Sequence, residues 1–369
     1  MPLSLLQPLQ HPLFKRHNVQ VEIKRDDLIH PIISGNKWRK LKYNLKQLEQ
    51  TSNNKPTFDG ILSFGGSYSN HIHALAYACF QQKIPCIGII RGEEQYKNNY
   101  TLTWARQWGM KLVFVDRKTY KRRNDEDYLK ALQHQYPQYF IVPEGGSNTL
   151  ALQGVSEVMD ELEQQTTFDT LLTPVGSGGT MAGLILGESR NHLINKDLAS
   201  QAPLQNPKRH KARHETLHRI LGISVLKGAQ YLNDEVNTLL KGEIDSDKVD
   251  SDNMATPITK ASLATSQQHK IGSSGGHWQL LHQFHQGGYA KFKVEDATRI
   301  AQWNKELGVC FEPVYSGKML LAFIDLLEQG YFKPNERIVL LHTGGLQGIG
   351  GMLERGILNA DTWQLPEIR

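Results

Sequence analysis

Short runs of apolar and β-branched residues alternate with segments of helical periodicity along most of the chain. Such runs are typical of strands that are buried on both faces. Strands that alternate with helices indicate βαβ units, a mostly parallel sheet and therefore an α/β fold. The predicted strands are 19–23, 60–64, 84–90, 111–115, 139–143, 171–175, 219–226, 309–315 and 337–343. The predicted helices begin after residue 36, cover 69–82, lie near 99–108 and 126–135, and begin again at about residue 179.

The length of 369 residues suggests two domains, or one large domain that carries an inserted one. Two polar stretches, 191–218 and 243–276, interrupt the alternation and are predicted to be surface insertions. In open parallel sheets, ligands bind at the carboxyl ends of the strands, where the next helix begins. The turns at these ends are therefore the places where we expect a functional site.

The composition is ordinary for a globular protein, with 39% apolar and 21% charged residues. The net charge of +5 suits an anionic small molecule and does not argue for nucleic acid as a partner. The three cysteines, Cys79, Cys86 and Cys310, form no paired motif, which favours a reducing compartment. We see no signal-peptide pattern and no apolar run of membrane-spanning length, so we expect a cytoplasmic enzyme without a membrane partner.

The strongest local signal is the stretch TPVGSGGTMAGL, residues 173–184. A predicted strand runs into a glycine-rich turn and then into a helix, so backbone N–H groups and the helix dipole can bind an anion. Met181 stands where a dinucleotide fingerprint needs its third glycine, and no Walker Gly-Lys-Ser/Thr follows. The turn therefore predicts one phosphate group rather than a pyrophosphate. Its candidate ligands are Gly176, Ser177, Gly178, Gly179 and Thr180.

Three further turns repeat this pattern: SFGGSYSNHIH (63–73), PEGGSNTLALQG (143–154) and LLHTGGLQGIGG (340–351). In the first, Ser69 and Asn70 open a helix, either as caps or as ligands of a carboxylate or cofactor oxygen. Lys37 follows another Ser-Gly-Asn turn, and it is either a solvated lysine or one that holds a cofactor. The histidines at 210, 214 and 218 are interpreted as an exposed basic face, and we predict no metal site.

Taken together, the turns resemble the fold-type II enzymes that use pyridoxal 5′-phosphate (PLP). Within that group, they resemble the D-cysteine desulfhydrase / 1-aminocyclopropane-1-carboxylate (ACC) deaminase family. Seven motifs in family order carry the resemblance across nearly the whole chain, outside the two polar stretches. They are RDDL (25–28), SGNKWRKLKY (34–43), SFGGSYSNH (63–71), PEGGSN (143–148), GSGGTMAGL (176–184), EPVYSGKM (312–319) and HTGG (342–345).

The resemblance implies a tryptophan synthase β-like fold with two parallel-sheet α/β domains. The larger, PLP-binding domain is expected from residues 1–50 and 161–369, and the smaller, inserted domain from residues 51–160. The active site is expected between the two domains. The resemblance also implies a homodimer that acts on a small amino acid.

The resemblance implies that Lys37 is the Schiff-base lysine, since burial in a PLP site lowers the pKa of an amine and makes it nucleophilic. Residues 176–180 are implied to hold the PLP phosphate, and Asn70 to contact the ring hydroxyl. Ser69 is implied to bind the substrate carboxylate and to take part in proton transfer. The residues that would border the substrate or the ring are Tyr315, Tyr289, Ser316 and Thr343.

Two positions bear on the substrate. ACC deaminases carry Glu at the position of Ser316 and Leu at the position of Thr343, so both residues resemble the desulfhydrase branch. A hydroxyl beside the ring nitrogen does not require a protonated ring, and a neutral ring favours prompt loss of a β-leaving group. We therefore expect α,β-elimination from D-cysteine to give pyruvate, hydrogen sulfide and ammonia.

Other readings stay open at this point. The same cofactor could act on ACC, D-serine, L-cysteine or a β-chloroamino acid. A nucleotide-binding enzyme of Rossmann type lacks support because the third glycine is absent. A non-catalytic binding protein would have no reason to keep both the lysine and the phosphate loop.

Overall fold

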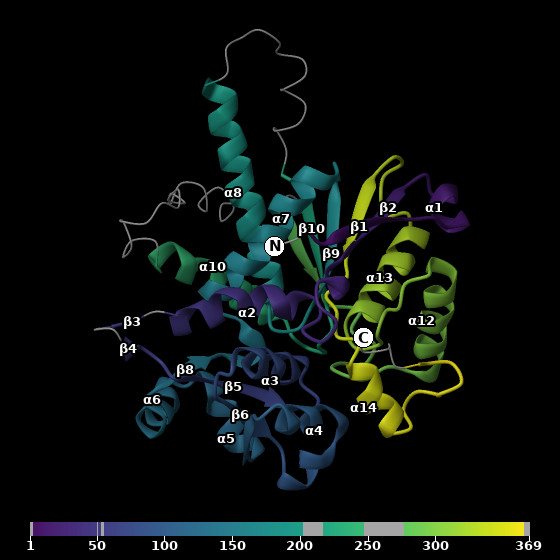
Figure 1. Ribbon diagram of the computed structural model, residues 1–369. Coiled ribbons are helices and arrows are strands. Elements are labelled where there is room, and N and C mark those ends of the chain that lie inside the picture. Colours follow the sequence, from purple (N-terminus) through teal and green to yellow (C-terminus); the bar gives the residue numbers. More distant parts are fainter. Residues whose placement is uncertain (1–2, 50, 53–54, 202–216, 247–276, 365–369) are drawn as a thin grey trace.

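The computed structural model describes residues 3–49, 51–52, 55–201, 217–246 and 277–364. Its strands form two main sheets, which lie one above the other in Figure 1, and one short hairpin. The larger sheet consists of β1 (Leu5–Leu9), β2 (Gln20–Arg25), β9 (Thr170–Val175), β10 (Arg219–Ser224), β11 (Trp278–Leu281) and β12 (Arg337–Leu341). The smaller sheet consists of β5 (Gly60–Gly66), β6 (Cys86–Arg91), β7 (Lys111–Val115) and β8 (Tyr139–Val142). The hairpin joins β3 (Thr51–Ser52) and β4 (Lys55–Pro56).

The larger sheet has the strand order β1-β2-β12-β9-β10-β11. Every pair is parallel except β1 with β2, which is antiparallel at the edge of the sheet. Helices cover both faces (Figure 1). One face is covered by α12 (Val294–Leu307) and α13 (Ser316–Glu328), and the other by α7 (Thr149–Gln165), α8 (Gly179–Gln201) and α10 (Leu232–Ser246).

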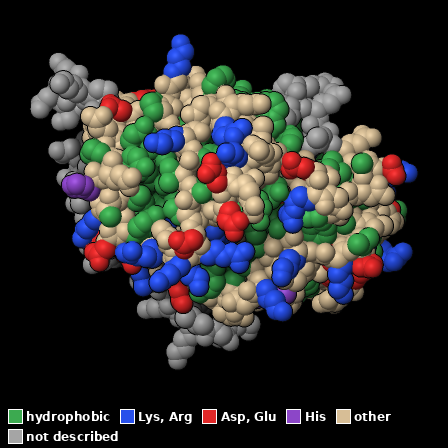
Figure 2. All heavy atoms as spheres, turned by 90° about the horizontal axis from the view of Figure 1, so that it is seen from below, with side chains coloured by type: hydrophobic (Ala, Val, Ile, Leu, Met, Phe, Trp, Pro, Cys, Tyr) green, Lys and Arg blue, Asp and Glu red, His purple; other side chains and the backbone are tan. Residues whose placement is uncertain are grey.

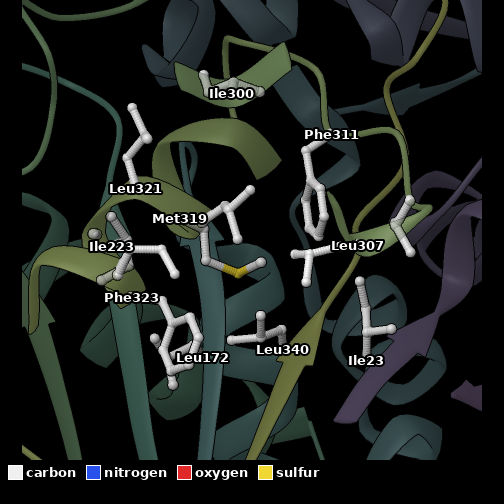
Figure 3. Packing of buried hydrophobic residues seen from close by; sticks show 14 of the residues in the cluster. Ile23, Leu172, Ile223, Ile300, Leu307, Phe311, Met319, Leu321, Phe323 and Leu340 are labelled. Carbon is white, nitrogen blue, oxygen red and sulfur yellow. The ribbon is translucent and has the colours of Figure 1, made fainter. Parts of the chain in front are cut away.

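The core between α13 and the larger sheet shows why its strands are apolar throughout. In Figure 3, Met319 and Phe323 of α13 point toward Leu172 of β9 and Leu340 of β12. All four side chains are fully buried. The neighbouring residues of these strands, such as Leu171, face the core under α7 and α8. Because both faces are covered, a central strand needs an unbroken apolar run.

The smaller sheet has four parallel strands in the order β7-β6-β5-β8. It also has helices on both faces: α3 (Asn70–Gln82) and α4 (Tyr100–Gln107) on one, α5 (Arg117–Lys121) and α6 (Glu126–Gln135) on the other. These two sheets confirm the predicted α/β class. The strands of the smaller sheet lie within 51–160, although the domain boundaries themselves stay a prediction. The remaining helices are α1 (Pro12–Arg16), α2 (Asn36–Lys46) and α14 (Gly348–Glu354).

The strand predicted at 309–315 is wrong. This segment is a turn that leads into α13. The Glu312 carboxylate accepts the backbone N–H groups of Val314 and Tyr315, so these amides serve the start of the helix and not a strand ladder. The prediction also missed β1 and β11 at the two edges of the sheet. Pro8 in β1 argues against a strand by sequence, but an edge strand tolerates it.

Most of the predicted insertion 191–218, and nearly all of 243–276, lies outside the described residues. In the described part, residues 191–201 continue α8 and residues 243–246 end α10. The first two of the three spaced histidines also lie outside the description. His218 lies within the described residues. Its Nδ1 atom is 2.9 Å from Glu188 Oε2, and its ring stacks on Phe168.

The face seen from below in Figure 2 carries Lys and Arg side chains in several groups, with Asp and Glu between them. Hydrophobic side chains separate these groups. The modest positive charge is therefore not gathered into one continuous basic surface on this face. None of the helices in the described part of the chain is both long enough and apolar enough to span a membrane.

Candidate active site

A cavity of about 890 Å³ opens between the two sheets. Its walls contain residues that follow the carboxyl ends of β5, β6 and β8 in the smaller sheet and of β9, β10 and β12 in the larger one. The glycine-rich turns singled out by sequence lie at these ends, which is where parallel sheets bind ligands. The cavity brings together Lys37, Ser69, Asn70, Gly176, Ser177, Gly178, Thr180, Tyr289, Tyr315 and Thr343.

Gly35 fixes the turn that places Lys37 on the cavity wall. The backbone of Gly35 has φ of 69°, and a Cβ atom there would lie 1.9 Å from the carbonyl oxygen of Thr343. The N–H group of Asn36 donates to the same oxygen at 3.2 Å. Only glycine allows this close approach and this backbone angle. The turn before Lys37 is therefore bound directly to the turn that carries Thr343.

Two lysine amines, one turn apart on α2, face the cavity. Burial lowers the pKa of the Lys37 amine to about 8, and its Nζ atom donates to Asn36 Oδ1 at 3.1 Å. Burial and the nearby Lys37 charge hold the pKa of Lys40 well below its ordinary value. No role was assigned to Lys40 from the sequence. Lys37 and Lys40 are three residues apart, which places them on one face of a helix. This spacing was the sequence signal that both amines lie on one wall of the cavity.

The glycine-rich loop before α8 faces Lys40. Lys40 Nζ donates to Ser147 Oγ at 2.9 Å, and Ser147 Oγ lies 2.8 Å from Ser177 Oγ. A Cβ atom on Gly179 would meet Ser147 Oγ at 2.5 Å and Lys40 Nζ at 2.9 Å, so a side chain there would fill the space between them. Gly179 does not itself line the cavity. The loop combines an amine, hydroxyl groups and a helix N-terminus around one point, and these groups attract a phosphate.

A hydrogen bond between Thr180 and Asn36 joins the glycine-rich loop to the turn before Lys37. Thr180 is the second residue of α8, and its Oγ1 atom accepts a hydrogen bond from Asn36 Nδ2 at 2.8 Å. Asn36 precedes Lys37 in the chain and receives a hydrogen bond from its amine. The contact therefore fixes the lysine relative to the glycine-rich loop.

The start of α3 forms the opposite wall. Ser69 is the N-cap of the helix, and its Oγ atom accepts a hydrogen bond from the Ile72 N–H group at 3.3 Å. Asn70 is the first residue of α3, and its Nδ2 atom would lie 2.7 Å from a Cβ atom on Gly345. His71 also lines the cavity, and its Nε2 atom is 2.7 Å from Ser63 Oγ. Free N–H groups at this helix start can receive a carboxylate.

Two tyrosines border the cavity, one of them beside Gly176 at the start of the glycine-rich loop. The rings of Tyr289 and Tyr315 meet edge to face with their centroids 5.9 Å apart. A Cβ atom on Gly176 would lie 3.1 Å from Cε1 of Tyr315, so this glycine leaves room for the ring. Burial and the neighbouring Tyr289 raise the pKa of the Tyr315 phenol well above its ordinary value. Tyr315 is therefore protonated at neutral pH and available as a hydrogen-bond donor.

The structure does not bring Ser316 to the cavity wall. Ser316 is fully buried, and its Oγ atom donates to Glu312 Oε1 at 3.2 Å. The Glu312 carboxylate lines the cavity instead, and burial raises its pKa to about 7 against the opposing effect of the backbone N–H groups it accepts. Sequence reasoning missed Glu312. A carboxylate that directly precedes the Pro-Val-Tyr turn was the signal that could have identified it.

Lys318 holds the loop that carries Tyr289. Its side chain is fully buried on α13, and its Nζ atom donates to the carbonyl oxygens of His285 at 2.8 Å and Gly288 at 2.6 Å. Positive φ angles at Gln286 and at both glycines of the loop bend the chain sharply there. A sharp loop with few regular contacts of its own needs such an anchor. Tyr289 is thus positioned from α13, the helix that begins next to Tyr315.

The described residues fit PLP. A buried amine of lowered pKa at Lys37 suits covalent attachment of an aldehyde. The glycine-rich turn, the hydroxyl groups of Ser177 and Thr180 and the Lys40 amine supply a cradle for one phosphate, in which a side chain on Gly179 would leave no room. The Lys37 amine and this phosphate cradle line the same cavity.

Comparison with known proteins decides the family. Residues 5–344 match the family model described as pyridoxal-phosphate dependent enzyme. This chain belongs to that family. PLP is therefore its cofactor, the chain is a PLP-dependent enzyme of a family of lyases, and the predicted fold type is confirmed.

Relatives agree with the resemblance seen in the motifs. A protein from Pyrococcus horikoshii, provisionally named a 1-aminocyclopropane-1-carboxylate deaminase, is 25% identical over 92% of this chain and 90% of its own length. The bifunctional D-cysteine desulfhydrase/ACC deaminase of Arabidopsis thaliana is 24% identical over 90% of this chain and 74% of its own length. The crystal structure of an ACC deaminase homologue superimposes with a TM-score of 0.70 at 24% identity, covering 96% and 93% of the two chains, which confirms the fold. The predicted family is thus confirmed.

Proposed function

We propose that this enzyme catalyses α,β-elimination from D-cysteine and yields pyruvate, hydrogen sulfide and ammonia. The observation that carries the proposal is the Lys37 amine, whose pKa burial lowers to about 8, in one cavity with a phosphate cradle. When bound, PLP supplies an electron sink for the carbanion that forms at the substrate Cα atom. The protein supplies the binding, the orientation and the proton transfers.

In this proposal, Lys37 takes the proton from the substrate Cα atom. An amine with a pKa near 8 is partly unprotonated at neutral pH and can act as a general base. Asn36 holds the amine through its Oδ1 atom and is itself held by Thr180. The phosphate of the cofactor would be bound by residues 176–180 together with Ser147 and Lys40.

The start of α3 is proposed to bind the substrate carboxylate. Ser69 and the free N–H groups at the helix start face the cavity, and they favour an anion there. Asn70 would contact the ring hydroxyl of the cofactor, and Thr343 would border the ring. Tyr315 and Tyr289 would border the substrate side, where their rings form one edge-to-face pair.

The choice of D-cysteine over ACC rests on residue types. Ser316 and Thr343 stand where ACC deaminases carry Glu and Leu, and both resemble the desulfhydrase branch. The nearby Glu312 carboxylate accepts the N–H groups of Val314, Tyr315 and Ser316, which occupy its oxygens. The name carried by the Pyrococcus relative favours ACC as the second candidate.

Incubation of the PLP-loaded enzyme with D-cysteine and, separately, with ACC tests this choice. We expect pyruvate and sulfide from D-cysteine, and no 2-ketobutyrate from ACC. L-cysteine and D-serine, run in parallel, report the preferred chirality and leaving group. Ketobutyrate from ACC, without sulfide from either cysteine, would reject the proposal in favour of an ACC deaminase.

Replacing Lys318 with methionine should raise KM for D-cysteine by about tenfold and leave the absorbance of bound PLP unchanged. The variant loses two charge-assisted hydrogen bonds to the Tyr289 loop but no group of the phosphate cradle. The exposed Lys305 on α12 gives the matched control, K305M, with ordinary kinetics. Steady-state kinetics and absorbance spectra of both variants provide the measurement. Loss of the PLP band in K318M would contradict a role confined to the Tyr289 loop.

We further propose that the enzyme is a cytoplasmic homodimer, as the resemblance implies. Light scattering coupled to size-exclusion chromatography distinguishes a dimer from a monomer of 41.8 kDa. Cell fractionation with an antibody against the native protein tests the location.

A further inference from the structure

Arg91 lies on the wall of the active-site cavity and is not explained by the cofactor. It is the last residue of β6, at the carboxyl end where parallel sheets bind ligands, and it pairs in register with Gly66 of β5. Its Nη2 atom would lie 3.4 Å from a Cβ atom on Gly66. The guanidinium therefore lies over the loop that leads from Gly66 to Ser69, and it lines the same cavity as Lys37.

The ring of Tyr120 fixes the orientation of this guanidinium. The guanidinium carbons of Arg91 and Arg123 each lie 5.4 Å from the centroid of the Tyr120 ring. Tyr120 is 2% exposed, and its hydroxyl donates to Glu144 Oε1 at 2.7 Å, so the ring cannot turn freely. Cation–π contact of this kind orients an arginine without consuming its N–H donors.

The charge of Arg91 is not compensated, whereas that of Arg123 is. Arg123 Nε donates to Glu144 Oε2 at 2.5 Å. The Arg91 side chain forms no ion pair and no hydrogen bond with any residue that the structure describes. Burial raises the pKa of the Tyr289 phenol, the charges of Glu144 and Glu312 add to that rise, and the positive charge of Arg91 acts against it, so the field of Arg91 reaches the cavity together with those of the two carboxylates. The cavity wall thus carries an exposed cation that the Tyr120 ring orients and whose N–H donors are unpaired.

We propose that Arg91 is a specificity-determining residue that binds a negatively charged substituent on the β-carbon of the amino-acid substrate. The inference rests on the proposed elimination. In that proposal the start of α3 already binds the α-carboxylate, so Arg91, at the end of the neighbouring strand, meets a second negative group. The substrate class is α-amino acids whose β-substituent carries a negative charge or leaves with one. Cysteine, whose thiol leaves as hydrosulfide, is a small member of this class.

The elimination step gives such a cation a function. The Cα–H bond breaks and its proton passes to Lys37, the Cα–Cβ double bond forms, and the Cβ–S bond breaks with its electron pair leaving on sulfur as hydrosulfide. One water then hydrolyses the released enamine to pyruvate and ammonia. A fixed donor near the departing sulfur stabilises the charge that develops there. ACC has no leaving group, so it would gain nothing from Arg91.

The binding test uses aspartate and asparagine, which have nearly the same shape and differ in the charge of the β-substituent. Isothermal titration calorimetry gives the dissociation constants of the D and L forms for the PLP-loaded wild type, R91M, R91K and the control R117M. Arg117 is exposed at the start of α5, just after β7, the strand that pairs with β6, and it lies outside the cavity lining. The enantiomer that binds more tightly to the wild type is used for the comparison.

We expect the wild type to bind aspartate about tenfold to a hundredfold more tightly than asparagine, the range for a hydrogen bond to a charged group. R91M should reduce this ratio to about one, R91K should keep part of it because it retains the charge, and R117M should keep all of it. Equal binding of the two ligands by the wild type would overturn the proposal. An undiminished ratio in R91M would also overturn it, because another cation would then be responsible.

The kinetic test separates this inference from the proposed function. R91M should lower kcat/KM for D-cysteine by about tenfold or more. It should change kcat/KM for β-chloro-D-alanine by much less, because chloride is a far weaker base than hydrosulfide and its departure needs less stabilisation. An equal loss on both substrates would reject the role at the β-substituent. If no β-substituted amino acid is turned over, the proposed elimination fails, and the aspartate ratio alone decides the role of Arg91.

Discussion

Replacing Lys37 with alanine is expected to abolish the absorbance band of covalently bound PLP and to lower turnover by at least about 10⁴-fold. The variant removes both the amine that would attach the cofactor and the base that would take the Cα proton. Removal of a general base alone costs about 10²- to 10⁴-fold in rate, so the combined loss lies at or beyond the upper end. Absorbance spectra and a pyruvate assay on the purified variant provide the measurement.

Two neighbouring lysines on α2 serve as controls for this variant. K40A should weaken the affinity for PLP but keep the covalent band at saturating cofactor, because Lys40 contacts Ser147 and the glycine-rich loop. K46A should resemble the wild type, since Lys46 is exposed and lies over the ring of Tyr43. If K37A keeps its band and K40A loses it, Lys40 is the attachment site and the assignment of Lys37 is wrong.

Replacing Arg39 with methionine is expected to lower the free energy of unfolding by about 3–5 kcal/mol, the cost of removing one partner from a buried ion pair. Arg39 is 2% exposed, and it donates to both oxygens of Asp26 at 2.7 and 2.8 Å and to Glu161 at 2.9 and 3.0 Å. Lys24 adds a second cation at 2.6 Å from Glu161. Without Arg39, Asp26 would remain buried as an unpaired carboxylate.

The loss of unfolding free energy in R39M is expected to become smaller as the pH falls. Burial acts to raise the pKa of Glu161, but the hydrogen bonds and charges of Arg39 and Lys24 lower it to about 2, below its ordinary 4.5. The stabilisation from this group is therefore fully present above pH 4.5 and is lost as the pH falls toward 2. The difference in stability between wild type and R39M should narrow over the same interval.

Urea denaturation of both proteins at several pH values measures this difference. The matched control is R122M. Arg122 forms an exposed pair with Asp125 at 3.4 Å, and its removal should change the free energy of unfolding by no more than about 0.5 kcal/mol. An R39M variant as stable as R122M would show that the Asp26–Arg39–Glu161 cluster does not stabilise the fold.

The Arg39 cluster also explains the RDDL motif, whose role the sequence left unstated. Asp26 binds Arg39 of α2, and Arg25 pairs with Asp27 at 2.7 Å. Through Arg39, the motif holds α2, the helix that carries the Lys37 amine, against the end of β2. A motif of this kind can be found by its residues, but its function depends on Arg39, which also binds Glu161, 122 residues further along the chain.

The alternation of strands and helices could be predicted from the sequence alone. Strands that are buried on both faces need apolar runs, and such runs can be recognised in a short stretch of sequence. The sequence also identified the glycine turns at the strand ends, because a turn that approaches an anion or another backbone tolerates no side chain. The predicted strand 111–115 coincides with β7, and the helix predicted from about residue 179 coincides with α8. The sequence predicted a strand at 309–315 wrongly, because its apolar run looks the same whether its amides pair with a strand or with the Glu312 carboxylate.

Which polar groups share the cavity could not be predicted from the sequence and is seen only in the folded chain. Lys40 lies beside the glycine-rich loop, Ser316 turns toward Glu312 and away from the cavity, and Arg91 remains unpaired while Arg123 binds Glu144. None of these outcomes follows from local periodicity. Contacts between residues far apart in the chain depend on how the two sheets are placed relative to each other. We propose that the charge left uncompensated by those contacts distinguishes one substrate from another.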